Sequence, residues 1–458
     1  MFKKILLLLV ITQITISCSK NDDVIADDPA KDNSIEAQIA AINLLPYSAL
    51  APPDQKIKLE NDANQMLTEL DLLKSSSAIE AIQNLERLIS INSIDYLIAG
   101  TNNNVQDLLS VSGAYGIYTW KNAMQVWVKT PSTSELKFVF PAKKTQTVNN
   151  TVFSSNGVSS TVKVEINDTR ERGNYIYNPI TNNYTYVILN PAVYDQFYLP
   201  SSVDSKLTID NLDVATFKLT NAFSGNKQAP DDATFKIILN DGYTWSFSGK
   251  KGLPNAISNS LTFNGKNLIE FNTNSTANID EILNNNSRPE YIGKANTLIK
   301  LLDNFLIVGQ NDFEQLTRDQ DLLKTSLVRP NYNTSTYYEN LNIYKKSYSE
   351  GSVVAYNKNI KMALVSKKDG TKIADIIQKS EKGYLSSNYV TWVPNVNSPG
   401  GYWQYNFNNT NPKMVQNYDE VLYLRFKDNT DVAFDVYFSS GFENLETKFQ
   451  NFVDSFNR

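Results

Sequence analysis

Apolar and polar residues alternate through much of the stretch from residue 113 to about residue 272, most clearly in segments 161–166 and 243–248. Side chains two apart in a strand share a face, so the pattern predicts strands with one buried face. Asn264-Gly265 lies between two such segments, and this dipeptide is typical of a type I′ hairpin turn. Because no segment of crossover-helix length separates the strands, the sequence predicts an antiparallel meander.

Segments with helical periodicity lie on both sides of this region. Pro52-Pro53-Asp54 is typical of a helix start, and apolar residues at helical spacing predict two packed amphipathic helices over 54–73 and 78–89. A second helical stretch is expected from about residue 278 to 327. It rests on two apolar stripes, one formed by Leu298, Leu301, Leu302 and Phe305, the other by Phe313, Leu316, Leu323 and Leu327. Further strands are expected at 362–365, 373–377, 421–426 and 432–438, and a last helix at 445–456.

These patterns predict that a group of helices is followed by a group of strands, and that this order occurs twice along the chain. The expected fold class is α+β, with antiparallel β-meander strands in one sheet, two sheets or a curved half-barrel, and amphipathic helices packed against them. We expect a signal peptide at 1–17, a flexible acidic tether at 18–53, a helical pair and sheet at 54–275, and a second helical segment with strands and a terminal helix at 276–458.

The N-terminal residues have the order of an export signal. Lys3 and Lys4 precede an apolar run at 5–16, which is too short to span a membrane. The run leads into Thr15-Ile16-Ser17-Cys18-Ser19, which resembles the lipobox of bacterial lipoproteins. This resemblance implies that Cys18 is lipidated and becomes the mature N-terminus, anchoring the chain to a membrane.

An acidic stretch follows the cysteine. Ser19-Lys20-Asn21-Asp22-Asp23 resembles the signal that carries lipoproteins of the Bacteroidota to the outer face of the outer membrane. Acidic runs are equally typical of a solvated tether, so a periplasmic and a cell-surface orientation both stay open. Residues 113–141, with Gly-Ile-Tyr-Thr-Trp and Phe-Val-Phe-Pro, are similar to stretches in uncharacterised flavobacterial lipoproteins, a resemblance that implies no particular activity.

The residue counts exclude several kinds of chemistry. The chain has no histidine and Cys18 is its only cysteine, which excludes Ser-His-acid and Cys-His nucleophiles, His- or Cys-based zinc sites and intrachain disulfides. It also lacks dinucleotide-binding, Walker and nucleophile-elbow motifs. The net charge of −5 provides no basic footprint for nucleic acid. We therefore expect no cofactor, no metal, no nucleic-acid partner and no enzymatic activity.

Aromatic residues are the remaining candidates for ligand binding, since the chain has 25 Tyr and 5 Trp. In segments 118–120 and 243–245, Tyr and Trp lie two apart and share a face. Such pairs predict either a platform for sugar rings or aromatic filling of half-buried sheets. Tyr402 is expected on the outer face of its strand, because Trp403, Tyr405 and Phe407 share the other face. The ligand-binding candidates are Tyr402, Tyr118, Trp120, Tyr243 and Trp245.

The expected function is that of a lipid-anchored outer-membrane lipoprotein, a non-catalytic binding or structural module. Its expected partners are the membrane, through lipid on Cys18, and a glycan or an apolar small ligand. One alternative is a carrier that shelters an acyl chain in a half-barrel. The other is a carboxylate-dependent glycan hydrolase, because two carboxylates roughly 5 to 10 Å apart in space cannot be recognised in a sequence.

Overall fold

The computed structural model describes residues 34–72, 75–92, 94, 114–284, 288–302, 304–395 and 400–438. The helices are α2 (Ile35–Asn43), α3 (Pro52–Leu72), α4 (Ser77–Ile91), α6 (Ile279–Leu283), α7 (Pro289–Ile292), α8 (Phe313–Ser326), α9 (Tyr337–Asn359) and α10 (Phe434–Tyr437). The strands of the main sheet are β1 (Gly116–Lys121), β2 (Val126–Thr130), β3 (Leu136–Phe140), β4 (Thr151–Thr169), β7 (Val193–Ile209), β8 (Leu212–Ala222), β9 (Asp232–Leu239), β10 (Tyr243–Lys250), β11 (Asn255–Phe263), β12 (Lys266–Ser275), β13 (Lys294–Leu301), β14 (Phe305–Asp312), β15 (Ile360–Ser366), β16 (Thr371–Asn388), β19 (Lys413–Arg425) and β20 (Asp431–Ala433). Two smaller pairs are β5 (Arg172–Asn178) with β6 (Asn183–Asn190), and β17 (Val390–Val393) with β18 (Tyr402–Tyr405).

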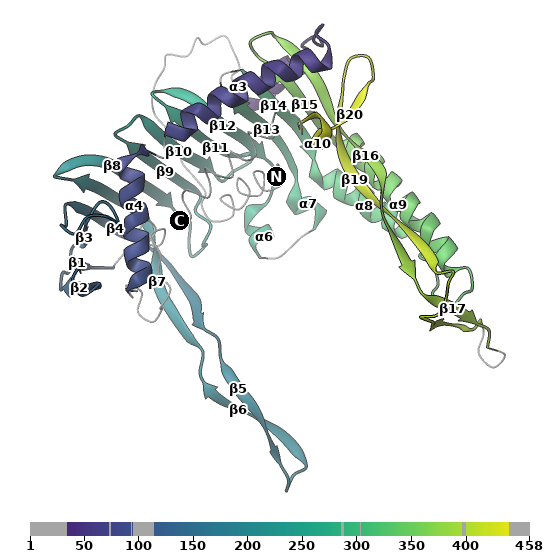
Figure 1. Cartoon of the computed structure of the whole chain (residues 1–458), viewed down its shortest axis with the longest axis horizontal. Coiled ribbons are helices and arrows are strands. Elements are labelled where there is room, and N and C mark those ends of the chain that lie inside the picture. Colours follow the sequence, from purple (N-terminus) through teal and green to yellow (C-terminus); the bar gives the residue numbers. More distant parts are fainter. Residues whose placement is uncertain are drawn as a thin grey trace.

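In the described part of the chain, one sheet of 16 strands runs through the molecule in the order β2-β1-β3-β4-β7-β8-β9-β10-β11-β12-β13-β14-β15-β16-β19-β20 (Figure 1). Neighbouring strands are antiparallel, except that β1 and β3 are parallel. Since β2 and β20 are separate edges, the sheet is open and not closed into a barrel. The predicted α+β fold, an antiparallel sheet with packed helices, is confirmed.

The hairpin turn at Asn264-Gly265 also matches its prediction. Both residues have positive φ, 49° and 77°, as a type I′ turn requires, and they connect the paired strands β11 and β12. The two helices predicted over 54–73 and 78–89 are present as α3 and α4. The backbone in these segments therefore follows local sequence patterns.

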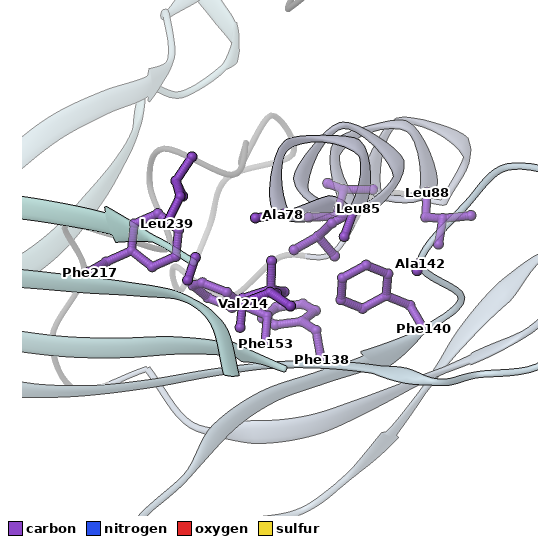
Figure 2. Packing of buried hydrophobic residues seen from close by; sticks show 14 of the residues in the cluster. Ala78, Leu85, Leu88, Phe138, Phe140, Ala142, Phe153, Val214, Phe217 and Leu239 are labelled. Atoms are coloured by element: carbon purple, nitrogen blue, oxygen red, sulfur yellow. The ribbon is translucent and has the colours of Figure 1, made fainter. Parts of the chain in front are cut away.

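Helix α4 packs on the β1 end of the sheet and forms the largest cluster of buried residues there (Figure 2). Ala78, Leu85 and Leu88 lie on one face of the helix and are fully or almost fully buried. They meet the buried rings of Phe138 and Phe153, which come from the sheet. This helix-on-sheet layer removes its large aromatic residues from water, the dominant favourable term in folding.

Further along, the sheet is covered on both faces. Leu59 of α3 packs with Phe305, whereas Ile39 of α2 packs with Leu306 and Val308. Because neighbouring residues of a strand point to opposite faces, α2 and α3 lie on opposite sides of β14.

This double coverage explains one wrong prediction. The region that we expected to be a helical stripe forms strands β13 and β14, joined through a turn at Leu302, where φ is 50°. A strand buried on both faces carries apolar residues at odd and even positions, which imitates helical spacing. The strands therefore contain, or directly flank, the four residues of the first expected stripe: Leu298, Leu301, Leu302 and Phe305. The second expected stripe, from Phe313 to Leu327, does lie in a helix, α8 and its C-cap residue.

Helix α9 is absent from the sequence prediction. It lies along β16 and β19 (Figure 1) and makes polar contacts, including a hydroxyl hydrogen bond of 2.8 Å between Ser349 and Ser380. The amide of Asn357 also donates to the carbonyl oxygen of Gln378, at 2.8 Å. A helix rich in Tyr, Ser and Asn lacks the wide apolar stripe by which amphipathic helices are recognised.

The tether prediction is wrong for residues 34–53. Residues 35–43 form α2, whose Ile39 has 0% exposure, and the backbone at Tyr47 bridges to Lys372 of β16. The helical spacing of Ile35, Ile39 and Ile42 is the signal that the acidic composition obscured. The remainder of the tether lies outside the described residues, as do the signal peptide, Cys18 and the expected helix at 445–456.

The expected domain boundary at residue 275 falls between two paired strands, because β12 and β13 are neighbours from Ile269↔Leu301 to Ser275↔Ala295. One continuous sheet thus crosses the boundary. At the end of the described chain, the strand expected at 432–438 is short, and residues 434–437 form the turn of helix α10. Among the described helices, none is long and apolar enough to cross a membrane.

Candidate functional site

Three of the candidate aromatic residues belong to the core. Tyr118, Trp120 and Tyr243 are only 3%, 1% and 2% exposed. Tyr118 stacks on Phe138 with ring centroids 5.1 Å apart, and the Tyr243 hydroxyl donates to the backbone carbonyl of Glu69. Burial raises the pKa of Tyr243 to about 12. These three side chains belong to the buried cluster that α4 covers, and they do not form an accessible platform.

Trp245, which lies two residues after buried Tyr243, is 38% exposed. Its indole nitrogen donates to the Asn259 side-chain oxygen at 2.7 Å, and its ring packs edge-on against Phe235. It lies on β10 in the middle of the sheet, whereas Tyr402 lies on β18, which pairs with β17 near one end of the molecule (Figure 1). The five predicted residues are therefore not brought together in one site.

The Tyr402 region is built on a buried tryptophan. Trp403 is 8% exposed, donates its indole N–H to the carbonyl oxygen of Thr334 at 3.2 Å, and packs edge-on against Tyr338 and Trp392. Tyr402 is 48% exposed. Tyr402 and Trp403 were predicted to lie on opposite faces of their strand, and their exposed fractions differ accordingly.

Trp403 and Tyr405 lie two apart in β18 and therefore share a face, but the packing that buries Trp403 does not cover Tyr405. Strand β18 ends at Tyr405, which is 64% exposed, and Phe407 beyond it is 84% exposed. The backbone N–H of Asn409 donates to the carbonyl oxygen of Asn406 at 3.1 Å, so the chain turns after the strand and strand parity does not extend to Phe407.

We call the exposed aromatic residues of this region, Tyr389, Tyr402, Tyr405 and Phe407, the aromatic tip. The rings of Tyr405 and Phe407 lie 4.9 Å apart. Amide groups lie among them: the Asn406 side chain donates to the Thr391 hydroxyl at 3.4 Å, and Gln404 is exposed. Flat rings beside amide donors and acceptors are suited to a flat, half-polar ligand such as a sugar.

A second exposed aromatic surface was missed by sequence reasoning. Strands β5 and β6 with their turn, residues 172–190, form a hairpin that projects far from the sheet (Figure 1); we call it the tyrosine hairpin. Tyr175 lies opposite Tyr186 and Tyr177 opposite Tyr184, with ring centroids 5.1 and 5.2 Å apart. Tyrosines at alternate positions, in a stretch without charged residues, were the available signal.

Many acidic groups in the described residues form ion pairs. Hydrogen bonds from the Arg425 guanidinium hold the pKa of Asp431 at about 2, and Lys358 does the same for Asp319. Where the pKa of a described carboxyl group is shifted, the shift is downward. In the same residues, His, Cys, Asp and Glu form no group of three that could hold a metal ion.

An open hollow of about 470 Å³ lies beside β1, lined by residues that include Trp120, Met124 and Asn149. Its lining comes from the end of β1, from the turn that follows β1 and from the loop before β4. Comparison with known protein families, curated proteins and solved structures finds no match for this chain.

Proposed function

We propose that this chain is a lipid-anchored outer-membrane lipoprotein that binds glycans through the aromatic tip without catalysing a reaction. The observation that carries the glycan proposal is the contrast within β18 and its extension. Three aromatic side chains, Tyr402, Tyr405 and Phe407, are exposed, while Trp403 between them is buried against α9 and β17. The buried indole fixes the hairpin from which the other rings project.

The physical basis is stacking on a surface that is already formed. A ring that is held in place loses little conformational entropy when a sugar stacks on it. Each stacked aromatic residue contributes on the order of 1 kcal/mol. Neighbouring amides such as Gln404 supply donors and acceptors for sugar hydroxyls.

Two alternatives are less well supported. A glycan hydrolase requires a carboxylic acid that stays protonated near neutral pH, whereas the shifted carboxyl groups described above have lowered pKa values. A carrier for an acyl chain requires an enclosed apolar cavity, and the open sheet gives this proposal no specific support.

Replacing Tyr402 with alanine should weaken glycan binding several-fold, because about 1 kcal/mol of stacking is lost. Glycan-array screening of the wild type identifies the ligand, and titration of the variants then measures the dissociation constant. Tyr115→Ala is the matched control, since Tyr115 is 39% exposed but lies next to β1. Absence of glycan binding by the wild type, or an equal loss in Tyr115→Ala, would exclude the aromatic tip as the site.

The anchor is tested at Cys18. If the resemblance to a lipobox is meaningful, Cys18→Ala should move the protein from the membrane to the soluble fraction or leave an unprocessed precursor. Palmitate labelling followed by fractionation measures both effects. Labelling that survives Cys18→Ala would refute lipidation at this residue.

A further inference from the structure

The tyrosine hairpin is exposed on every side. Strand β5 pairs with β6 alone among the described strands, and every residue from Asn174 to Asn178 and from Asn183 to Asn190 is exposed. A two-stranded hairpin is marginally stable in water by itself, whereas three or more strands with an apolar face are stable. Nine large apolar side chains are exposed on it: Tyr175, Ile176, Tyr177, Ile180, Tyr184, Tyr186, Val187, Ile188 and Leu189.

The composition of the hairpin restricts its partner. Residues 173–194 contain no charged side chain, so charge complementarity cannot direct recognition. Edge strands are usually protected by lysine, proline or a bulge. Segments 174–178 and 183–188 contain none of these, and the one register shift of the pair falls beyond them, at Leu189. Unpaired backbone groups along both edges would be costly in lipid hydrocarbon, so a protein strand is the favoured partner.

The free backbone groups of β6 can be assigned from a close approach at Gly173. A methyl group on Gly173 would lie 2.5 Å from the carbonyl oxygen of Val187, so this carbonyl points toward β5. Backbone groups of successive strand residues point in alternate directions. Tyr186 and Ile188 therefore direct their N–H and C=O groups away from β5, along a free edge.

This free edge is complementary to itself. If a two-fold axis passes through Tyr186, an antiparallel second β6 sets Tyr186 opposite its own copy and Tyr184 opposite Ile188. The same register sets Thr185 opposite Val187 on the other face. Aromatic with β-branched, and β-branched with β-branched, are favourable cross-strand pairs. Isologous pairing of this kind is the commonest arrangement in homodimers.

We propose that the tyrosine hairpin joins two copies of this chain by antiparallel pairing of their β6 strands. The product is a four-stranded sheet in which the tyrosine ladders of both copies share one face. It satisfies the requirement for more than two strands and pairs the backbone edge that is free in one copy. The surface lies on a different element from the aromatic tip, so this inference does not depend on the glycan proposal.

Paired charge substitutions at Tyr186 test the two-fold axis. In sedimentation experiments on the full chain in detergent, the wild type should dimerise as its concentration rises. Tyr186→Lys and Tyr186→Glu should each raise the dimer dissociation constant at least about tenfold, because like charges lie directly opposite. An equimolar mixture should regain dimerisation, and Val354→Lys on the exposed face of α9 should not alter it. A monomeric wild type, or a mixture that stays monomeric, would overturn the proposal.

A backbone substitution tests edge pairing separately from side-chain contact. Ile188→Pro and Ile188→Ala both remove the isoleucine side chain. Only the proline variant also removes the backbone N–H, which the hairpin itself does not use. The proline variant should lose dimerisation, and the alanine variant should retain most of it, with unchanged circular dichroism for both. Equal behaviour of the two variants would exclude β6 edge pairing. A dimer that meets these tests but binds no glycan would sustain this inference and refute the proposed function.

Discussion

Replacing Phe138 with alanine should lower the free energy of unfolding by about 3–5 kcal/mol. Phe138 has 0% exposure, and its ring stacks on Tyr118 at 5.1 Å and meets the edge of Trp127 at 5.6 Å. Truncation removes the buried ring and leaves a cavity between α4 and the sheet (Figure 2), where close-packed neighbours relax only in part. Denaturant titration followed by tryptophan fluorescence measures the loss.

Val128→Ala is the control for this experiment, since Val128 is 40% exposed on the edge strand β2. It should change the free energy of unfolding by less than about 0.5 kcal/mol. A similarly small effect of Phe138→Ala would show that the cluster beneath α4 is not a packed core, and with it the placement of α4 would fail.

Replacing Trp403 with alanine should also cost about 3–5 kcal/mol of stability. The change removes an indole packed against Tyr338 and Trp392, together with the hydrogen bond to the carbonyl of Thr334. The ring contact with Tyr338 and the hydrogen bond to Thr334 fasten the β17–β18 pair to the start of α9. Thermal unfolding measures the loss, and hydrogen exchange shows whether amides of β18 and α9 lose protection together.

Tyr402→Ala is the neighbouring control for this second result. Tyr402 is 48% exposed, so its truncation should leave thermal unfolding nearly unchanged while weakening glycan binding. If Tyr402→Ala destabilised the protein as much as Trp403→Ala, Tyr402 would be a packing residue and the aromatic tip would lose its central member.

Local patterns in the sequence are enough to predict part of this fold. Alternation and the Asn264-Gly265 turn specified antiparallel strands, because strand faces repeat every two residues and a type I′ turn needs two residues with positive φ. Helical spacing located α3 and α4. The same parity argument separated exposed Tyr402 from buried Trp403.

Which of these surfaces are covered depends on tertiary packing. Tyr243 and Trp245 share a face of β10, yet their exposures are 2% and 38%, because the end of α3 reaches Tyr243, whose hydroxyl donates to Glu69. Strands β13 and β14 were mistaken for a helix because α2 and α3 cover both of their faces. The tyrosine hairpin has an alternating pattern like that of a core strand, and only its projection beyond the sheet leaves it exposed (Figure 1). Burial depends on contacts between segments far apart in the chain, and these are not encoded in any local window of sequence.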